Sequence, residues 1–339
     1  MSSSRGIQST KSSVSQARSS TPDFQTLLHF KNLEMRARIV VEGFMSGLHR
    51  SPYHGFSVEF TDYRQYSPGD DPRFLDWKLL ARTDRAFIKR FEDETNLRCT
   101  LLVDQSRSMG FGSLGYTKAD YARTLAASLA YFLHRQRDAT GLMTFDDAVV
   151  EYIPARYRPG HLRRLLISLE RAVSGTDTGI SEAMQLATNL VRKRGLMVVI
   201  SDLLTPLDAL RTQLSYLQSC RHDVIIFRIL DPQEIQFNFD QEALFEDLES
   251  SKQIYVDPKS TQQHYIKLFD SHAATLKQIC DDLGVELHTL STDEPLEKAL
   301  LEFVAGRSRK TSQQARRTTH RNRSAQNRRE IAIQEKVNG

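Results

Sequence analysis

Three oxygen-bearing side chains stand at alternate positions directly after an apolar run of the sequence. Asp104, Ser106 and Ser108 follow residues 99–103, whose composition predicts a short buried strand. Ligands of open α/β sheets bind at the carboxyl ends of the strands, and carboxylate and hydroxyl oxygens suit a small hard cation such as Mg²⁺. Serine and aspartate are also common in turns and helix caps, so this D-x-S-x-S pattern alone does not define a metal site.

Two later segments carry matching oxygen donors. Thr176 lies in the glycine-flanked loop 174–179, just before a helical pattern. Asp202 follows Ser201 at the end of the continuous apolar run 195–200, as expected of a strand that is buried on both faces. A parallel sheet would bring both loops to the edge that holds Asp104, so the three segments are candidates for one site.

The order of a D-x-S-x-S loop, a Gly-Thr loop and a strand-terminal aspartate is similar to the metal-ion-dependent adhesion site of von Willebrand factor A domains. The resemblance implies that Ser106, Ser108 and Thr176 are direct ligands of the cation. It implies that Asp104 and Asp202 act largely through water, and that an acidic side chain of a partner completes the shell. The implied cofactor is Mg²⁺ or Mn²⁺, and the implied function is a metal-dependent protein interaction.

The segment 54–92, before the predicted sheet, combines aromatic residues, arginines and the turn Pro68-Gly69-Asp70-Asp71. It resembles the signature of the bacterial "domain of unknown function 58" family, and the resemblance extends over roughly residues 30–300. Members of that family often accompany MoxR-type AAA+ ATPases. The resemblance therefore implies such an ATPase, or its client, as the partner of this chain, with a role in chaperoning or assembly.

The same segment supplies candidate partner-binding residues, namely Arg64, Tyr66, Arg73 and Arg82. Arginine and aromatic residues are enriched at interface hot spots. The alternative is that this segment serves packing, with Trp77, the single tryptophan, anchoring it onto the sheet. The two interpretations are compatible for different residues.

A G-x-G-x-x-G pattern at Gly110, Gly112 and Gly115 offers nucleotide binding as an alternative function. Its first glycine falls six residues after Asp104 rather than at the strand end. Its last glycine is 31 residues before Asp146, whereas the dinucleotide-binding pattern has an acid about 20 residues on. We therefore expect a Gly/Ser loop that enters a helix.

A hydrolase that uses the same divalent cation as a Lewis acid is the other alternative. Ser106 and Ser108 lack the G-x-S-x-G elbow of a serine nucleophile. The ten histidines are scattered, and none is expected in a loop facing Asp104. The sequence also has no G-x-x-x-x-G-K-[ST] loop. We therefore expect a protein that is not an enzyme.

Strand-like and helix-like patterns alternate through residues 97–305, which predicts a mainly parallel α/β sheet flanked by helices, and the resemblance implies the von Willebrand A type for it. A small helix-plus-strands region is expected at 23–96, with a helix over 24–49 and short strands after it. Residues 1–22 and 306–339 are polar and are expected to be disordered tails.

Composition and charge set further bounds on the class of protein. Hydrophobic residues make up 40% of the 339 residues, which is ample for a large core, and no apolar run predicts a transmembrane helix or a secretory signal. Cys99, Cys220 and Cys280 lie in apolar segments without C-x-x-C spacing, so buried free thiols in a reducing cytoplasm are expected.

The net charge of +4 is unevenly distributed. Residues 306–339 contain ten Lys or Arg and two acids, a net charge of +8, which leaves −4 for the rest of the chain. Such a tail could bind nucleic acid or anionic lipid by charge alone. It has no aromatic residue on which bases could stack.

Overall fold

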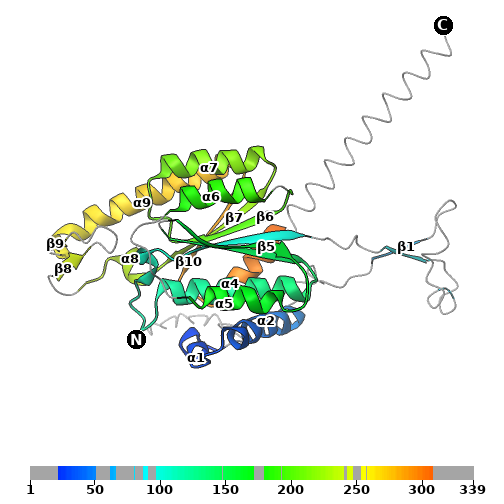
Figure 1. Cartoon of the computed structure of the whole chain (residues 1–339). Coiled ribbons are helices and arrows are strands. Elements are labelled where there is room, and N and C mark those ends of the chain that lie inside the picture. Colours follow the sequence, from blue (N-terminus) through cyan, green and yellow to red (C-terminus); the bar gives the residue numbers. More distant parts are fainter. Residues whose placement is uncertain are drawn as a thin grey trace, which may run out of the picture.

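The computed structural model describes residues 22–50, 62–65, 80, 87–90, 97–146, 148–171, 179–191, 193–239, 243–246, 253–256 and 258–307. Its centre is a six-stranded sheet with the order β10-β7-β6-β3-β4-β5 (Figure 1). The strands are β3 (Arg98–Asp104), β4 (Ala139–Phe145), β5 (Val149–Arg156), β6 (Leu196–Ser201), β7 (Asp223–Leu230) and β10 (Glu286–Ser291). All neighbouring strands are parallel except β4 and β5. The predicted mainly parallel α/β sheet is therefore confirmed.

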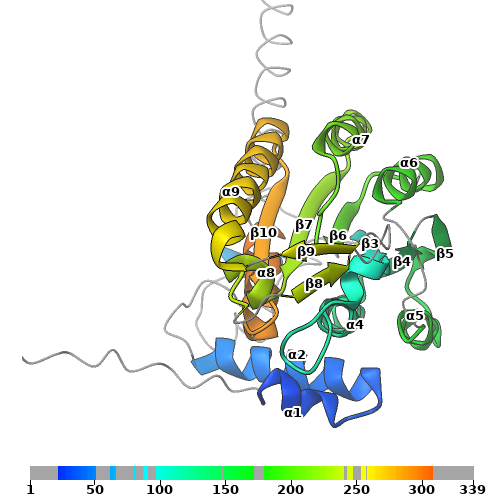
Figure 2. The ribbon, with the colours of Figure 1, turned by 90° about the vertical axis from the view of Figure 1, so that its left-hand side faces the viewer.

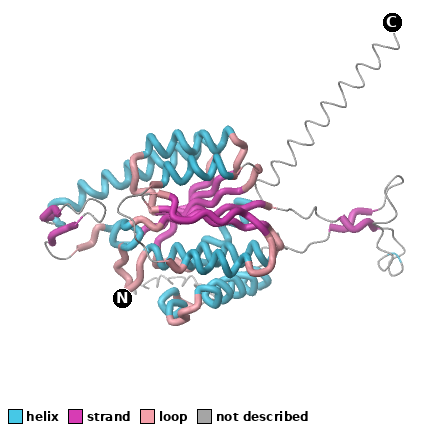
Figure 3. The backbone as a smooth tube through the Cα atoms, in the orientation of Figure 1, coloured by secondary structure: helices cyan, strands magenta, loops and turns pink. Residues whose placement is uncertain are grey.

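Helices cover both faces of this sheet, which explains why its central strands are apolar on both sides. One face packs against α4 (Lys118–Arg135), α5 (His161–Leu169) and a helix over 296–307. The other packs against α6 (Ile180–Leu190), α7 (Leu207–Ser219) and α9 (Pro258–Leu283). Figure 3 shows the sheet between these layers. Side chains alternate accordingly, since Leu101 and Val103 belong to the first core and Leu102 to the second.

The N-terminal helices form an additional layer outside α4. The helix expected over 24–49 is instead two helices, α1 (Phe24–Leu28) and α2 (Leu33–Arg50). Asn32 explains the break, because its side-chain oxygen accepts hydrogen bonds from the backbone N–H groups of Glu34 (2.8 Å) and Met35 (3.2 Å) and so caps α2. Buried residues on α2 recur at helical spacing and include Ala37, Val40, Val41 and Phe44.

Short elements complete the described part of the chain. Strands β1 (Asp62–Gln65) and β2 (Phe87–Arg90) form an antiparallel ribbon, which confirms short strands in the 54–92 segment. Strands β8 (Ala243–Glu246) and β9 (Gln253–Val256) form a second ribbon. The last helix reaches 307 and so includes the first two residues of the expected C-terminal tail. Among the described residues, no helix is long and apolar enough to span a membrane.

The strand order reverses direction between β3 and β6. From β3 the chain passes through α4 to β4 on one side, and it later returns to place β6 on the other side of β3. In open α/β sheets, ligands bind outside the carboxyl ends of the strands at such a switch point. Figure 2 looks at the molecule from the side where α8 (Pro232–Gln236), β8 and β9 lie in front of the sheet.

Candidate functional site

Asp104 is the last residue of β3 and lies at the switch point, with only 1% of its surface exposed. Its Oδ1 accepts a hydrogen bond from the backbone N–H of Ser106 (2.8 Å), and its Oδ2 accepts one from Ser201 Oγ (2.5 Å). Burial and the negative charge of Asp202 raise the pKa of Asp104 to about 7. Hydrogen bonds from the two serines oppose this shift, and they hold the carboxylate in one orientation.

The two serines of the D-x-S-x-S motif lie beside each other. Ser106 Oγ is 3.1 Å from Ser108 Oγ, and Ser106 is fully buried. A short 3₁₀ helix, η2 (Arg107–Gly110), sets this geometry, because it turns the chain directly after Ser106 and buries Met109 beneath the loop. Ser201, the residue before Asp202 at the end of β6, donates its hydroxyl hydrogen bond to Asp104 of the motif. The motif on β3 and the end of β6 are therefore in direct contact.

Asp202 is buried and already paired with a positive charge. Its Oδ2 lies 2.7 Å from Lys118 Nζ, and its Oδ1 accepts a hydrogen bond from the backbone N–H of Leu204 (3.3 Å). Burial works to raise the pKa of Asp202, but the charge of Lys118 outweighs it and the pKa is lowered. Asp202 is therefore an anion at neutral pH.

Lys118 was not predicted as a member of this site. Its side chain is fully buried, and its Nζ contacts Glu234 Oε1 (2.6 Å) as well as Asp202. Burial lowers the pKa of Lys118, but the two carboxylates outweigh burial and raise it overall. The sequence gives no signal of this role, because a charged residue at a helix start is usually solvated. Lys118 begins α4, where the helix dipole disfavours a cation, so its burial there requires acidic neighbours from elsewhere in the fold.

Glu234 comes from α8 and is held by two bonds. Its Oε1 meets Lys118, and its Oε2 accepts a hydrogen bond from the backbone N–H of Asp231 (2.9 Å) in a capping box. Asp231 is tied in turn to Ser113, accepting from its backbone N–H (2.9 Å) and its hydroxyl (2.6 Å). The loop after η2 and the helix α8 are thereby fastened together at this edge.

Arg228, near the end of β7, adds a second buried cation. Its Nε donates to the backbone oxygen of Asp202 (3.1 Å), and its guanidinium lies over the ring of Phe269 at 5.1 Å. Tyr265 stacks on Phe237, with ring centroids 4.3 Å apart, and its hydroxyl donates to the backbone oxygen of Glu234 (2.9 Å). Aromatic rings from α9 thus pack beside the charged cluster.

The structure brings together four of the five predicted metal-site residues, namely Asp104, Ser106, Ser108 and Asp202. Thr176 lies outside the described residues. Within the described ranges, no group of three or more His, Cys, Asp or Glu is placed to hold a metal ion. The donor set here is of another kind, since two hydroxyls and two carboxylates offer only oxygen, which suits Mg²⁺ or Mn²⁺. Among the described residues, the buried Asp104 carboxylate faces the charge of Asp202 and is held by hydrogen bonds, so it also favours a cation nearby.

The predicted partner-binding residues are described only in part. Arg64 lies in β1, where it pairs in register with Ile88 of β2. Tyr66, Arg73 and Arg82 lie outside the described residues. Their role in partner binding therefore stays a prediction.

The glycine pattern after η2 has a packing explanation. A side chain at Gly112 would collide with the backbone of Tyr116 and Thr117, so this position requires glycine for close approach. Thr117 then caps α4 in a capping box with Asp120. Gly112 therefore shapes the entry to α4, as expected of a Gly/Ser loop that enters a helix.

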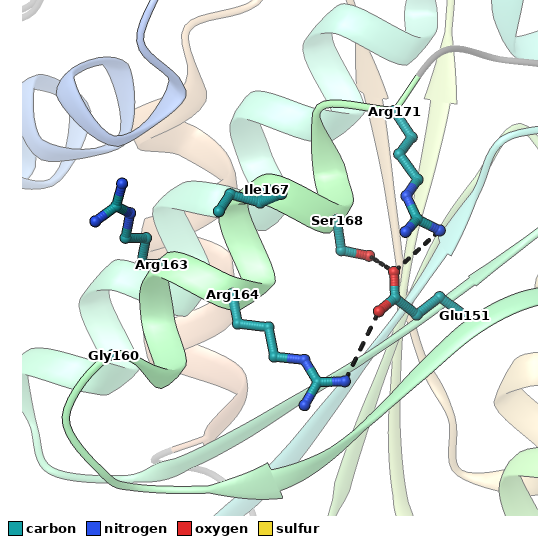
Figure 4. A pocket seen from close by; sticks show the side chains of 7 residues that line it. All are labelled: Glu151, Gly160, Arg163, Arg164, Ile167, Ser168 and Arg171. Carbon is teal, nitrogen blue, oxygen red and sulfur yellow. Dashed lines mark hydrogen bonds and ion pairs between the residues drawn. The ribbon is translucent and has the colours of Figure 1, made fainter.

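A pocket of about 240 Å³ lies elsewhere, on α5 and β5 (Figure 4). Glu151 is its central charge and accepts a hydrogen bond from Ser168 (2.8 Å). Arg171 and Arg164 also reach its carboxylate, at 3.2 Å and 4.0 Å. None of the predicted site residues line this pocket. The arginine contacts neutralise the Glu151 carboxylate and tie α5 to β5.

The sheet order, the helical layers and the oxygen-lined loop at the switch point define a von Willebrand factor A-like α/β protein. A family model described as "Protein of unknown function DUF58" matches residues 62–275. The chain belongs to this family.

Similar proteins include uncharacterised proteins of Mycobacterium tuberculosis and Mycobacterium bovis. Each is 26% identical over 284 residues, covering 82% of this chain and 89% of the relative. Among solved structures, an aerotolerance-related membrane protein of Bacteroides fragilis has 14% identity and a TM-score of 0.44, covering 62% of this chain and 98% of that one. The conserved hypothetical protein BatB of Bacteroides thetaiotaomicron has 14% identity and a TM-score of 0.43, with coverages of 62% and 99%.

Proposed function

We propose that this chain is a non-catalytic protein-interaction module that binds an Asp or Glu side chain of a partner through Mg²⁺ or Mn²⁺ at the carboxyl edge of its sheet. The observation that carries the proposal is the convergence of the D-x-S-x-S loop with Asp202. The hydroxyls of Ser106 and Ser108 are 3.1 Å apart, Ser201 beside Asp202 bonds to Asp104 from the neighbouring strand, and the charge of Asp202 acts on Asp104. This occurs at the switch point, where α/β sheets bind ligands.

The ion would be held by the hydroxyls of Ser106 and Ser108, together with Thr176, while Asp104 and Asp202 would supply negative charge behind them. When bound, a divalent cation offers an open coordination position to a carboxylate oxygen. The chain itself contributes a rigid support, because Ser201 and the backbone of Ser106 fix the Asp104 carboxylate.

On the family resemblance, the proposed partner is a MoxR-type AAA+ ATPase or its client. The proposed location is the cytoplasm. Three free thiols suit a reducing compartment. A second contact through Arg64, Tyr66, Arg73 and Arg82 would add to the affinity, since arginine and tyrosine are frequent anchors of interfaces.

The state of Lys118 removes one candidate general base from the alternative of a metal-dependent hydrolase. A general base must be able to accept a proton near neutral pH. The ammonium of Lys118 is held between Asp202 and Glu234, and these charges raise its pKa above the usual value. Lys118 therefore cannot serve as that base.

A pull-down with the MoxR-type ATPase of the same organism tests this function. Wild-type chain should retain the ATPase in Mg²⁺ and release it in EDTA, and the double variant Ser106→Ala/Ser108→Ala should fail to retain it in either buffer. Ser215→Ala is the matched control, because Ser215 is exposed on α7 and bonds only to the backbone of Arg211. Equal retention of the ATPase by wild type and the double variant in Mg²⁺ would refute the proposal.

A further inference from the structure

Lys118 connects the candidate site to a helix that is distant in sequence. Its ammonium lies 2.7 Å from Oδ2 of Asp202, after β6, and 2.6 Å from Oε1 of Glu234, on α8. None of its side chain is exposed. A lysine is rarely buried to this extent unless it is paired with acids. The two carboxylates therefore make the burial of the Lys118 ammonium possible.

The local sequence alone does not favour a cation here. Lys118 is the first residue of α4, where the N-terminal end of the helix dipole repels positive charge. The capping of that helix is already complete without it, because Thr117 and Asp120 form a capping box. The positive charge thus serves the network at the sheet edge and not the helix.

Among the described residues of the buried cluster, acids outnumber cations. The acids are Asp104, Asp202, Asp231 and Glu234, and the cations in contact with Asp202 or Glu234 are Lys118 and Arg228. This excess of acidic side chains leaves room for a further cation beside Lys118.

We infer that Lys118 is the resident cation of this site: it holds Asp202 and Glu234 together in the metal-free protein, and it competes with a divalent ion for Asp202. The inference rests on the proposed function, because it concerns how the same site is regulated. The contacts of Asp202 carry it. Its Oδ2 is bonded to Lys118 and its Oδ1 to the backbone N–H of Leu204, so an ion that draws on this carboxylate must share it with an ammonium. Like charges at such short range repel strongly inside a protein.

Two variants and one control test the competition, with the dissociation constant of Mn²⁺ measured by the electron paramagnetic resonance signal of the free ion. Lys118→Met removes the charge at similar length, and it should tighten Mn²⁺ binding by about tenfold or more. Glu234→Gln leaves Lys118 to Asp202 alone and should weaken Mn²⁺ binding by about tenfold. Lys298→Met is the control, since Lys298 is 44% exposed and pairs with Glu294 away from the site. It should leave the constant unchanged.

Melting temperature in EDTA supplies an independent readout. If Lys118 holds two acids together, Lys118→Met should melt well below wild type in EDTA, and its melting temperature should recover in Mn²⁺. Lys298→Met should melt like wild type in both buffers. Should Lys118→Met fail to fold, the double variant Lys118→Met/Glu234→Gln takes its place, because it removes one charge of each sign. It should bind Mn²⁺ about tenfold more tightly than Glu234→Gln alone.

The outcomes separate this inference from the proposed function. If wild type binds Mn²⁺ and Lys118→Met binds it equally or less tightly, the resident-cation role is wrong while the metal-dependent function stands. If wild type does not bind Mn²⁺ and Lys118→Met does, the competition is upheld and the metal-dependent function of wild type fails. If neither protein binds Mn²⁺, both are overturned.

Discussion

Ser201 Oγ donates a 2.5 Å hydrogen bond to Oδ2 of Asp104, so the last residue of β6 orients the last residue of β3. The same hydroxyl accepts a bond from the backbone N–H of Leu203 (3.1 Å). One buried serine therefore fixes both the acid of the D-x-S-x-S loop and the chain that follows Asp202. The two strand ends at the switch point form one unit, which explains how residues about a hundred positions apart keep a defined geometry.

Replacing Ser201 by alanine should destabilise the fold by roughly 1–3 kcal/mol, because it leaves a buried charged acceptor and a backbone N–H without their partner. The free energy of unfolding in urea measures this, with Ser215→Ala as the exposed control. The slope of unfolding against urea should stay the same in both variants. A loss equal to that of the control would mean that the Ser201 hydroxyl does not support Asp104.

Divalent ions should raise the melting temperature of the wild-type chain. At a hundredfold excess over its dissociation constant, an ion that binds only the folded state stabilises by about 2.7 kcal/mol. For a domain of this size, that corresponds to a shift of roughly 5–10 °C. Ser106→Ala/Ser108→Ala should lose the shift while remaining folded, and Ser215→Ala should keep it. Identical melting of wild type in saturating Mg²⁺ and in EDTA would count against a metal site.

The sequence was sufficient to predict the sheet and the four described residues of the candidate site. Leu101, Leu102 and Val103 are all apolar because β3 is covered on both faces, and such a run is recognisable without a structure. Asp104 and Asp202 directly follow such runs, so their placement at one edge follows from a parallel sheet alone. Motifs at strand ends are therefore the part of a site that can be predicted from the sequence.

Lys118 and Glu234 could not be found in this way. Their contact joins the start of α4 to α8, 116 residues later, and it depends on how two helices are fastened over the sheet edge. Charged residues at helix starts are usually solvated, so neither residue stands out by type or spacing. The burial of Lys118 is the decisive fact, and burial of a single charged side chain is a property of tertiary packing.

The prediction of three buried thiols was wrong for one of them. Cys99 and Cys280 are buried, but Cys220 is exposed. Cys220 follows α7, whose buried face consists of Leu210, Leu214 and Leu217, and its position past the helix end places it off that face. The apolar residues of this segment therefore form the buried face of α7, and they do not indicate that Cys220 is buried.

Thiol reactivity should reflect this difference. Burial raises the pKa of Cys99 well above the ordinary value and raises that of Cys280 to about 11, so both remain unreactive thiols in the folded protein. Ellman's reagent should titrate one thiol in the native chain and three in guanidinium chloride. Cys220→Ser should abolish the native reaction. Native titration of more than one thiol would indicate local opening around Cys99 or Cys280.

Arginines of the 54–92 segment should contribute to partner binding and little to stability. Arg64→Ala and Arg73→Ala should leave the melting temperature within a few degrees of wild type, since surface substitutions usually cost under about 0.5 kcal/mol. Both should weaken the complex with the ATPase in a pull-down. Arg211→Ala is the control, because Arg211 is 59% exposed on α7. If both variants unfold the protein, the segment is scaffold and the interface lies elsewhere.

The boundary of the C-terminal tail can be tested to within two residues. Arg307 ends the last helix, and its Nη1 lies 3.0 Å from Oδ2 of Asp138 and 2.5 Å from Oε1 of Gln136. Asp138 is 1% exposed and also accepts a hydrogen bond from the backbone N–H of Leu97 (3.2 Å), at the entry to β3.

Truncation after Arg307 keeps this ion pair and should therefore leave the melting transition unchanged. Truncation after Ala305 should cost roughly 1–3 kcal/mol, because it leaves the buried Asp138 carboxylate without its cation. Circular dichroism melts of the two truncations decide this, with full-length Arg307→Ala expected to match the shorter one. Equal stability of both truncations would show that the Asp138–Arg307 pair contributes nothing to the fold.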